Sequence, residues 1–186
     1  METMKLTECI SGLHELKRDA QESQKKGLPF IMSSVIIWTL ILLVQFLHKD
    51  VVKTNLYTFM CSCYLMPLSF MFSKLIKADI FKKSKNPINS LGFLCTMNQT
   101  LYLIIVMWAY NQKPEAMVML YAMVFGAHLL PFGWIYDSLA YKLISIADTI
   151  GALIICMVWG VVPMIIFVIV AQIILCVSLF IEVKKL

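Results

Sequence analysis

Residues 117–149 have the sequence MVMLYAMVFGAHLLPFGWIYDSLAYKLISIADT, in which two long apolar runs meet at a turn over residues 130–138. The first run contains His128 and the second contains Asp148. Ionisable side chains are rare in segments that cross lipid, and those that occur usually have a partner, a cavity or an ion pathway. We therefore expect both residues to lie inside a membrane and to serve a function there.

The composition of the whole chain supports a membrane protein. Of its 186 residues, 60% are apolar and only 15% are charged, and its mean hydropathy is +0.81. A soluble domain is normally about a quarter charged. The apolar residues form runs of about 20, which as helices cross a hydrocarbon core roughly 30 Å thick. A membrane barrel would instead show short alternating strands. The predicted fold class is therefore all-α, an integral membrane bundle of six transmembrane helices.

The chain divides into two predicted parts. Residues 1–28 are polar, with an apolar stripe at three- and four-residue steps, which predicts a short amphipathic helix on the membrane or against a cytoplasmic loop. A helix that binds a partner protein is the alternative. Residues 29–186 form the transmembrane domain. The predicted spans are 29–47, 55–73, 88–110, 115–132, 138–159 and 162–180.

The basic residues predict the orientation. With six spans, 13 of the 16 lysines and arginines fall on one side of the membrane and three on the other. This bias predicts that both termini lie in the cytoplasm. Five lysines between Lys74 and Lys85 set the orientation and contact anionic headgroups, and the alternative is a specific site for an anionic lipid or phosphate. Aromatic and basic residues are not interleaved, so no nucleic-acid partner is expected.

Polar residues recur near the middle of several spans and suggest a site. Asn98 and Gln99 lie near the middle of the third span, Asp148 near the middle of the fifth and Gln172 near the middle of the sixth. His128 lies about 7 Å from the middle of the fourth. A lone carboxylate in hydrocarbon is unfavourable, and His128, Asn98 and Gln99 are donors that could pair with Asp148. These four residues are the predicted substrate-binding or proton-relay site, for a small polar solute or a proton.

Two other kinds of function remain open. Amides, hydroxyls and histidines often only join helices, for about 0.6 kcal/mol each, as in a non-transporting immunity, stress or partner-binding factor. Ser145, His128 and Asp148 could form a nucleophile system, but their spacing does not demand catalysis. The chain has no metalloprotease, phosphate-loop or nucleophile-elbow motif, so we predict no catalytic residue, metal or cofactor. The cysteines are expected to be unpaired, and a homo-oligomer is possible.

Four segments of the chain resemble a known family. They are KKGLPF at residues 25–30, Trp38, Asn98 with Gln99, and HLLPFGWIY at residues 128–136. In these segments the chain is similar to an uncharacterised family of small bacterial multi-spanning integral membrane proteins, described only as a domain of unknown function. The resemblance covers about residues 15–180. It implies a bacterial inner membrane and brings no activity, ligand or catalytic residue.

Overall fold

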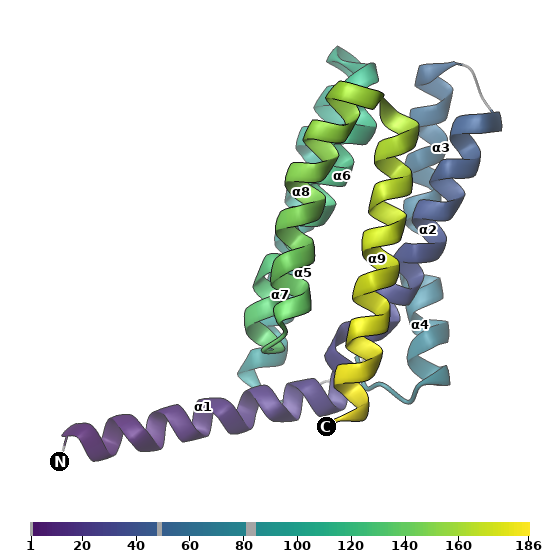
Figure 1. Ribbon diagram of the computed structural model, residues 1–186. Coiled ribbons are helices and arrows are strands. Elements are labelled where there is room, and N and C mark those ends of the chain that lie inside the picture. Colours follow the sequence, from purple (N-terminus) through teal and green to yellow (C-terminus); the bar gives the residue numbers. More distant parts are fainter. Residues whose placement is uncertain (1, 48–49, 81–84) are drawn as a thin grey trace.

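The protein is a helical bundle with one helix projecting from its base (Figure 1). The computed structural model describes the backbone of residues 2–47, 50–80 and 85–186, and the side chains from Ile10 onward within these ranges. Six segments of the described chain are long and apolar enough to cross a membrane, which confirms the predicted fold class. The helices are α1 (Glu2–Gln24), η1 (Lys25–Gly27), α2 (Leu28–Leu47), α3 (Val51–Cys63), α4 (Leu65–Leu75), α5 (Pro87–Gln112), η2 (Pro114–Ala116), α6 (Met117–His128), α7 (Leu130–Ile135), α8 (Leu139–Trp159) and α9 (Val161–Lys184).

Proline interrupts two of the spans. The second span is divided between α3 and α4 at Tyr64, and the fourth is divided between α6 and α7 at Leu129. Pro67 and Pro131 lie in the first turn of the second piece in each case. Proline has no N–H to donate, and its ring clashes with the carbonyl four residues earlier, but a first helical turn tolerates it. The turn expected over residues 130–138 is therefore mostly helix, because α7 continues to Ile135 and leaves only residues 136–138 as the connection.

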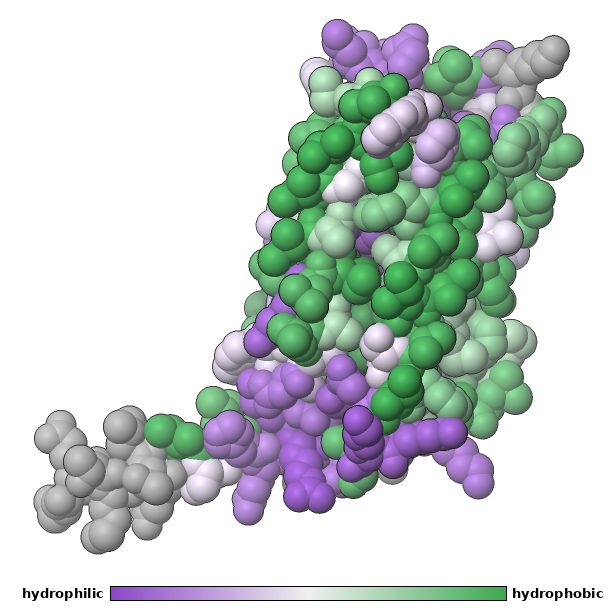
Figure 2. Space-filling model, in the orientation of Figure 1, coloured by the Kyte–Doolittle hydropathy of each residue, from purple (hydrophilic) through white to green (hydrophobic). Residues whose placement is uncertain are grey.

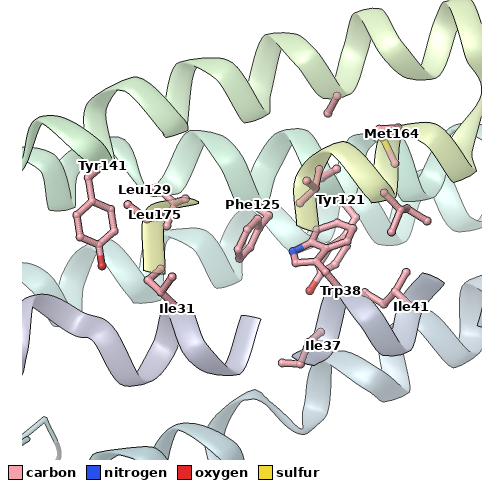
Figure 3. Close-up of a cluster of buried hydrophobic side chains, with 14 of the residues drawn as sticks. Ile31, Ile37, Trp38, Ile41, Tyr121, Phe125, Leu129, Tyr141, Met164 and Leu175 are labelled. Carbon is pink, nitrogen blue, oxygen red and sulfur yellow. The ribbon is translucent and has the colours of Figure 1, made fainter. Parts of the chain in front are cut away.

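The core lies between α2, α6 and α9. In the most apolar stretch of each span, 44% of the residues are buried in the span containing α6 and 39% in α9, compared with 11% in α5. Trp38 of α2 is almost completely buried, and its ring centroid lies 5.4 Å from that of Tyr121 and 5.5 Å from that of Phe125 on α6 (Figure 3). The inner helices are thus held by large interlocking side chains, while α5 lies at the periphery.

Hydrophilic residues lie at both ends of the bundle, and the larger group gathers at the lower end, below a broad apolar belt (Figure 2). We call this the basic end. It holds α1, the C-terminus of α9 and the described parts of the connections after α4 and α7. The expected N-terminal helix is present as α1, with 23 residues, and it contacts α5 and α7. The side chains of Leu6 and Cys9, and the lysines Lys82 and Lys83, lie outside the described residues.

Candidate functional site

The centre of the bundle contains a buried carboxylate, Asp148, halfway along α8. Its side chain is completely buried. Gln172 of α9 donates from Nε2 to Asp148 Oδ2 at 2.6 Å. Ser34 of α2 shares its one hydroxyl hydrogen between the carbonyl oxygen of Ile31 at 2.8 Å and Gln172 Oε1 at 3.1 Å. Asp148 Oδ1 has no hydrogen-bond partner among the described residues. Three helices thus meet at a carboxylate of which only one oxygen is satisfied.

A glycine brings a fourth helix against this carboxylate. A Cβ atom at Gly126 of α6 would lie 2.8 Å from Asp148 Cβ and 2.8 Å from the backbone nitrogen of Thr149. Ser145 Oγ donates to the carbonyl oxygen of Gly126 at 2.8 Å. Small residues allow helix backbones to approach closely inside a membrane, and hydroxyl groups then bond across the contact. The α6 backbone therefore closes one side of the site.

A second polar contact lies next to the first on α2. Ser69 of α4 donates to Ser33 Oγ at 3.1 Å, and Ser33 donates to the carbonyl of Pro29 at 2.8 Å. Both serines are completely buried. Ser33 thus contacts α4, whereas its neighbour Ser34 contacts α9. We call Asp148, Gln172 and Ser34 the Asp148 cluster, and Ser33 does not belong to it.

The described hydrogen bonds do not join the four residues predicted as one site. His128 hydrogen-bonds through Nδ1 with the carbonyl of Phe125, and its ring lies 5.3 Å from that of Phe125 and 6.1 Å from that of Phe132. Asn98 is exposed on the outer surface of α5, and Gln99 is half-buried. Of the four, only Asp148 is completely buried, and its hydrogen-bond partner is Gln172. The roles of His128, Asn98 and Gln99 stay predictions.

The sequence predicted the depth of Gln172 in its span, but it did not predict that Gln172 would belong to the site. Depth along a span follows from counting residues, whereas the direction in which a side chain faces depends on which helices are neighbours. The spans are apolar on most sides, so no amphipathic pattern reveals the inner face. Ser34 is one of several small polar residues in its span, and nothing in its spacing distinguishes it from the others.

The described residues show no hydrogen bonds that would link Ser145, His128 and Asp148 into a nucleophile system. Ser145 donates to the Gly126 carbonyl and Thr149 donates to the Ser145 carbonyl, both at 2.8 Å, and neither is bonded to His128. Within the described ranges, no three His, Cys, Asp or Glu side chains are grouped as a metal site. The five cysteines whose side chains are described are unpaired.

Comparison with known proteins places this helical bundle in a family. The model of a family of unknown function, DUF7010, matches residues 13–182. The chain belongs to this family. The match includes all four segments on which the resemblance was based and confirms membership of an uncharacterised family, while a bacterial origin stays a prediction. No curated protein and no solved structure matches the chain.

In this DUF7010 member, the basic end contains a second buried polar cluster, in which the charges are paired. Lys26 is only 6% exposed, and its Nζ lies 2.7 Å from Glu182 Oε2. Ser138 donates to the other oxygen, Glu182 Oε1, at 3.0 Å. Tyr141 donates to the carbonyl of Lys26 at 2.9 Å. Both carboxylate oxygens are thus satisfied, and the cluster joins the start of α2 to α8 and the end of α9.

A neighbouring set of contacts attaches α1. Lys17 Nζ lies 2.7 Å from Asp137 Oδ1 and 4.1 Å from the centroid of the Trp134 ring. Tyr136 donates to Gln24 Oε1 at 2.6 Å. Burial raises the pKa of Tyr136, so its hydroxyl keeps the proton that it donates. The segments at residues 25–30 and 128–136, which carry the resemblance to the family, therefore meet at the basic end, where Gly27 lies against Tyr136.

Proposed function

We propose that the protein binds protons at Asp148 and moves protons, alone or with a small polar solute, across the membrane. The observation that carries this proposal is the unpartnered Oδ1 of a completely buried carboxyl group in the middle of a span. Ionisable groups at such depth are costly and commonly mark ion or proton pathways. A structural carboxylate would be expected to have both oxygens bonded, as Glu182 has at the basic end.

The contacts of Asp148 allow both of its protonation states. A proton on Oδ1 leaves Oδ2 free to keep accepting the Gln172 N–H. When the proton leaves, the same N–H stabilises the negative charge, and Ser34 orients the Gln172 amide through its oxygen. The site can therefore change its charge without rearranging its bonds, which suits repeated binding and release.

The first test compares wild type with Asp148→Asn in proteoliposomes that contain a pH-sensitive dye. We expect proton flux driven by a membrane potential in wild type and none in the variant, because the amide cannot take up a proton. The infrared C=O band of a protonated carboxyl group should also titrate with pH in wild type and lose that component in Asp148→Asn. Equal flux in both proteins would contradict the proposal.

Two adjacent serines provide a matched pair of variants. Ser34→Ala removes the hydroxyl that bonds to Gln172, whereas Ser33→Ala removes one that bonds only outside the Asp148 cluster. We expect Ser34→Ala to slow proton flux several-fold and Ser33→Ala to leave it unchanged. Equal effects of the two variants would indicate general loosening of α2 and not a role for the Gln172 contact.

A non-transporting membrane factor is the second candidate, and the close approach at Gly126 favours it. The α6 backbone lies against Asp148 so tightly that the carboxyl could serve only to join helices. Wild type would then show no proton flux, its carboxyl band would not titrate, and Asp148→Asn would act only on the free energy of unfolding.

We propose further that the protein lies in the cell membrane with its basic end in the cytoplasm. This orientation is supported by the basic residues, of which 13 lie on the cytoplasmic side and three on the other side. The exposed side chains of Lys77 and Lys85 at the basic end are suited to anionic headgroups. A fluorescent protein fused after Leu186 should fold and fluoresce, whereas alkaline phosphatase at the same position should be inactive. The reverse pattern would contradict this orientation.

A further inference from the structure

Helix α5 presents a regular exposed stripe. Only 11% of its most apolar stretch is buried, and its inner contacts are mainly with α6. Along the outer side, alternating steps of three and four residues connect six side chains, which we call the α5 seam. They are Leu91, Leu94, Asn98, Leu101, Ile105 and Trp108. All six are exposed, and the five apolar ones are between 37% and 63% exposed.

This stripe has the spacing of a coiled-coil seam. Apolar residues that repeat with a period of 3.5 occupy the a and d positions of a heptad. Here Leu91, Asn98 and Ile105 occupy the a positions, and Leu94, Leu101 and Trp108 occupy the d positions. The inner side of α5 uses other residues, such as Gly92, Val106 and Ala109, which are buried in the bundle. The seam is therefore a second surface that the fold of one chain does not use.

Asn98 indicates what covers this surface. Its side chain is exposed near the middle of the span, and the described residues give its amide no hydrogen-bond partner. Lipid tails cannot hydrogen-bond, so an amide facing them is unfavourable. An amide contains both a donor and an acceptor and is satisfied by an identical amide. A single Asn at an a position is known to favour parallel two-stranded pairing.

Insertion in a membrane also favours a parallel pair of α5 helices. Two copies inserted with the same orientation have parallel α5 helices, and a two-fold axis along the membrane normal brings equal positions opposite each other. A different partner would need a polar group at the same depth and on the same helical face, whereas a second copy supplies one automatically. We propose that the protein forms a parallel homodimer through the α5 seam, in which Asn98 bonds to the partner subunit's Asn98. This proposal does not depend on the function proposed for Asp148.

The test measures self-association of the full chain in phosphatidylcholine vesicles, by energy transfer between differently labelled copies at a series of protein-to-lipid ratios. We expect wild type to dimerise. Asn98→Leu should weaken the dimer about tenfold, because a pair of interhelical hydrogen bonds in a membrane contributes roughly that factor in model helices. Asn98→Gln retains an amide and should remain close to wild type, which excludes misfolding as the cause.

The control is Thr100→Val, which removes a polar group from the same helix at an exposed position outside the seam. It should leave dimerisation unchanged. Monomeric wild type over the whole series would overturn the proposal. So would equal dimerisation of Asn98→Leu and wild type, or equal losses in Asn98→Leu and Thr100→Val.

A second measurement locates the contact. Ile105→Cys introduces a thiol on the seam, and Met107→Cys introduces one at a similarly exposed position away from it. Under mild oxidation in vesicles, Ile105→Cys should form more disulfide-linked dimer than wild type does. Wild type contains only the native cysteines, and its level of cross-linking is the blank. Met107→Cys should not exceed the blank. Cross-linking of Met107→Cys as strong as that of Ile105→Cys would place the interface elsewhere and overturn the proposal.

Discussion

The protein contains two carboxylates in contrasting surroundings: Asp148 is completely buried, whereas the side chain of Glu182 is 28% exposed but lies against the buried Lys26. At the basic end, Glu182 uses both oxygens, one with Lys26 and one with Ser138. In the middle of the bundle, Asp148 uses one oxygen with Gln172, and its other oxygen has no partner among the described residues. Both groups join helices, but only Glu182 has a cation beside it.

The contrast separates a structural role from a chemical one. A buried charge that is paired and fully hydrogen-bonded contributes to holding one arrangement, and removal of one partner leaves the other uncompensated. A buried acid with a free oxygen contributes little to stability but can accept a proton or a ligand atom. The free energy of unfolding measured on matched variants should therefore fall clearly when Glu182 is changed and hardly at all when Asp148 is changed.

The largest effect is expected at the paired carboxylate. Glu182→Gln removes the negative charge beside the buried Lys26 ammonium and should lower the free energy of unfolding by about 2–3 kcal/mol. Unfolding in mixed micelles of a mild detergent and dodecyl sulfate, followed by circular dichroism, gives this quantity. Glu22→Gln is the control, because its ion pair with Arg18 is exposed and should contribute almost nothing.

A smaller but clear loss is expected where α6 closes the Asp148 site. Gly126→Ala places a methyl group 2.8 Å from both Asp148 Cβ and the backbone nitrogen of Thr149, so the two helices must separate. Overpacking of this kind costs about 1–3 kcal/mol. In Gly12→Ala the new methyl group meets nothing within 4 Å, and the variant should be neutral or slightly more stable. Tolerance of alanine at Gly126 would show that the contact is loose.

The attachment of α1 should show an intermediate effect of about 1 kcal/mol. Lys17→Ala removes both the contact with Asp137 and the packing on Trp134, and the exposure of Asp137 limits the loss. Protease cleavage within α1 should become faster in this variant, because the helix is released from the bundle. Arg18→Ala, next to it on the exposed side, should behave like wild type.

The smallest effect is expected at the unpaired carboxylate. Asp148→Asn keeps an oxygen that accepts the Gln172 N–H, so the free energy of unfolding should change by less than about 0.5 kcal/mol. This is the same acid-to-amide exchange as Glu182→Gln, measured in the same assay. A loss at Asp148 as large as that at Glu182 would remove the distinction between the two sites and favour the structural role.

The six spans could be predicted because apolar runs of sufficient length report directly on the membrane. The interruptions within two spans were only partly predictable. Pro67 and Pro131 were visible, but whether the chain turns or restarts a helix after proline depends on its neighbours, and at Leu130–Ile135 it restarts. The pairing of Asp148 was predicted with His128, Asn98 and Gln99 as donors, while the structure shows Gln172 as its hydrogen-bond partner.

The paired cluster at the basic end could not have been inferred from spacing. Lys26 and Glu182 are 156 residues apart, and Lys17 and Asp137 are 120 apart. These pairs exist because α1 lies across the end of the bundle and because Lys25, Lys26 and Gly27 adopt left-handed backbone angles where it joins α2. Nothing in the local sequence required that turn.

The sequence alone determined that this chain spans a membrane six times as helices, since hydrocarbon accepts only apolar segments whose backbone groups bond to one another. Tertiary structure alone decided which polar groups meet, because each helix can rotate about its axis until its neighbours fix the inner face. That rotation placed Gln172 against Asp148, placed Glu182 against Lys26, and left Asn98 on the outside of α5.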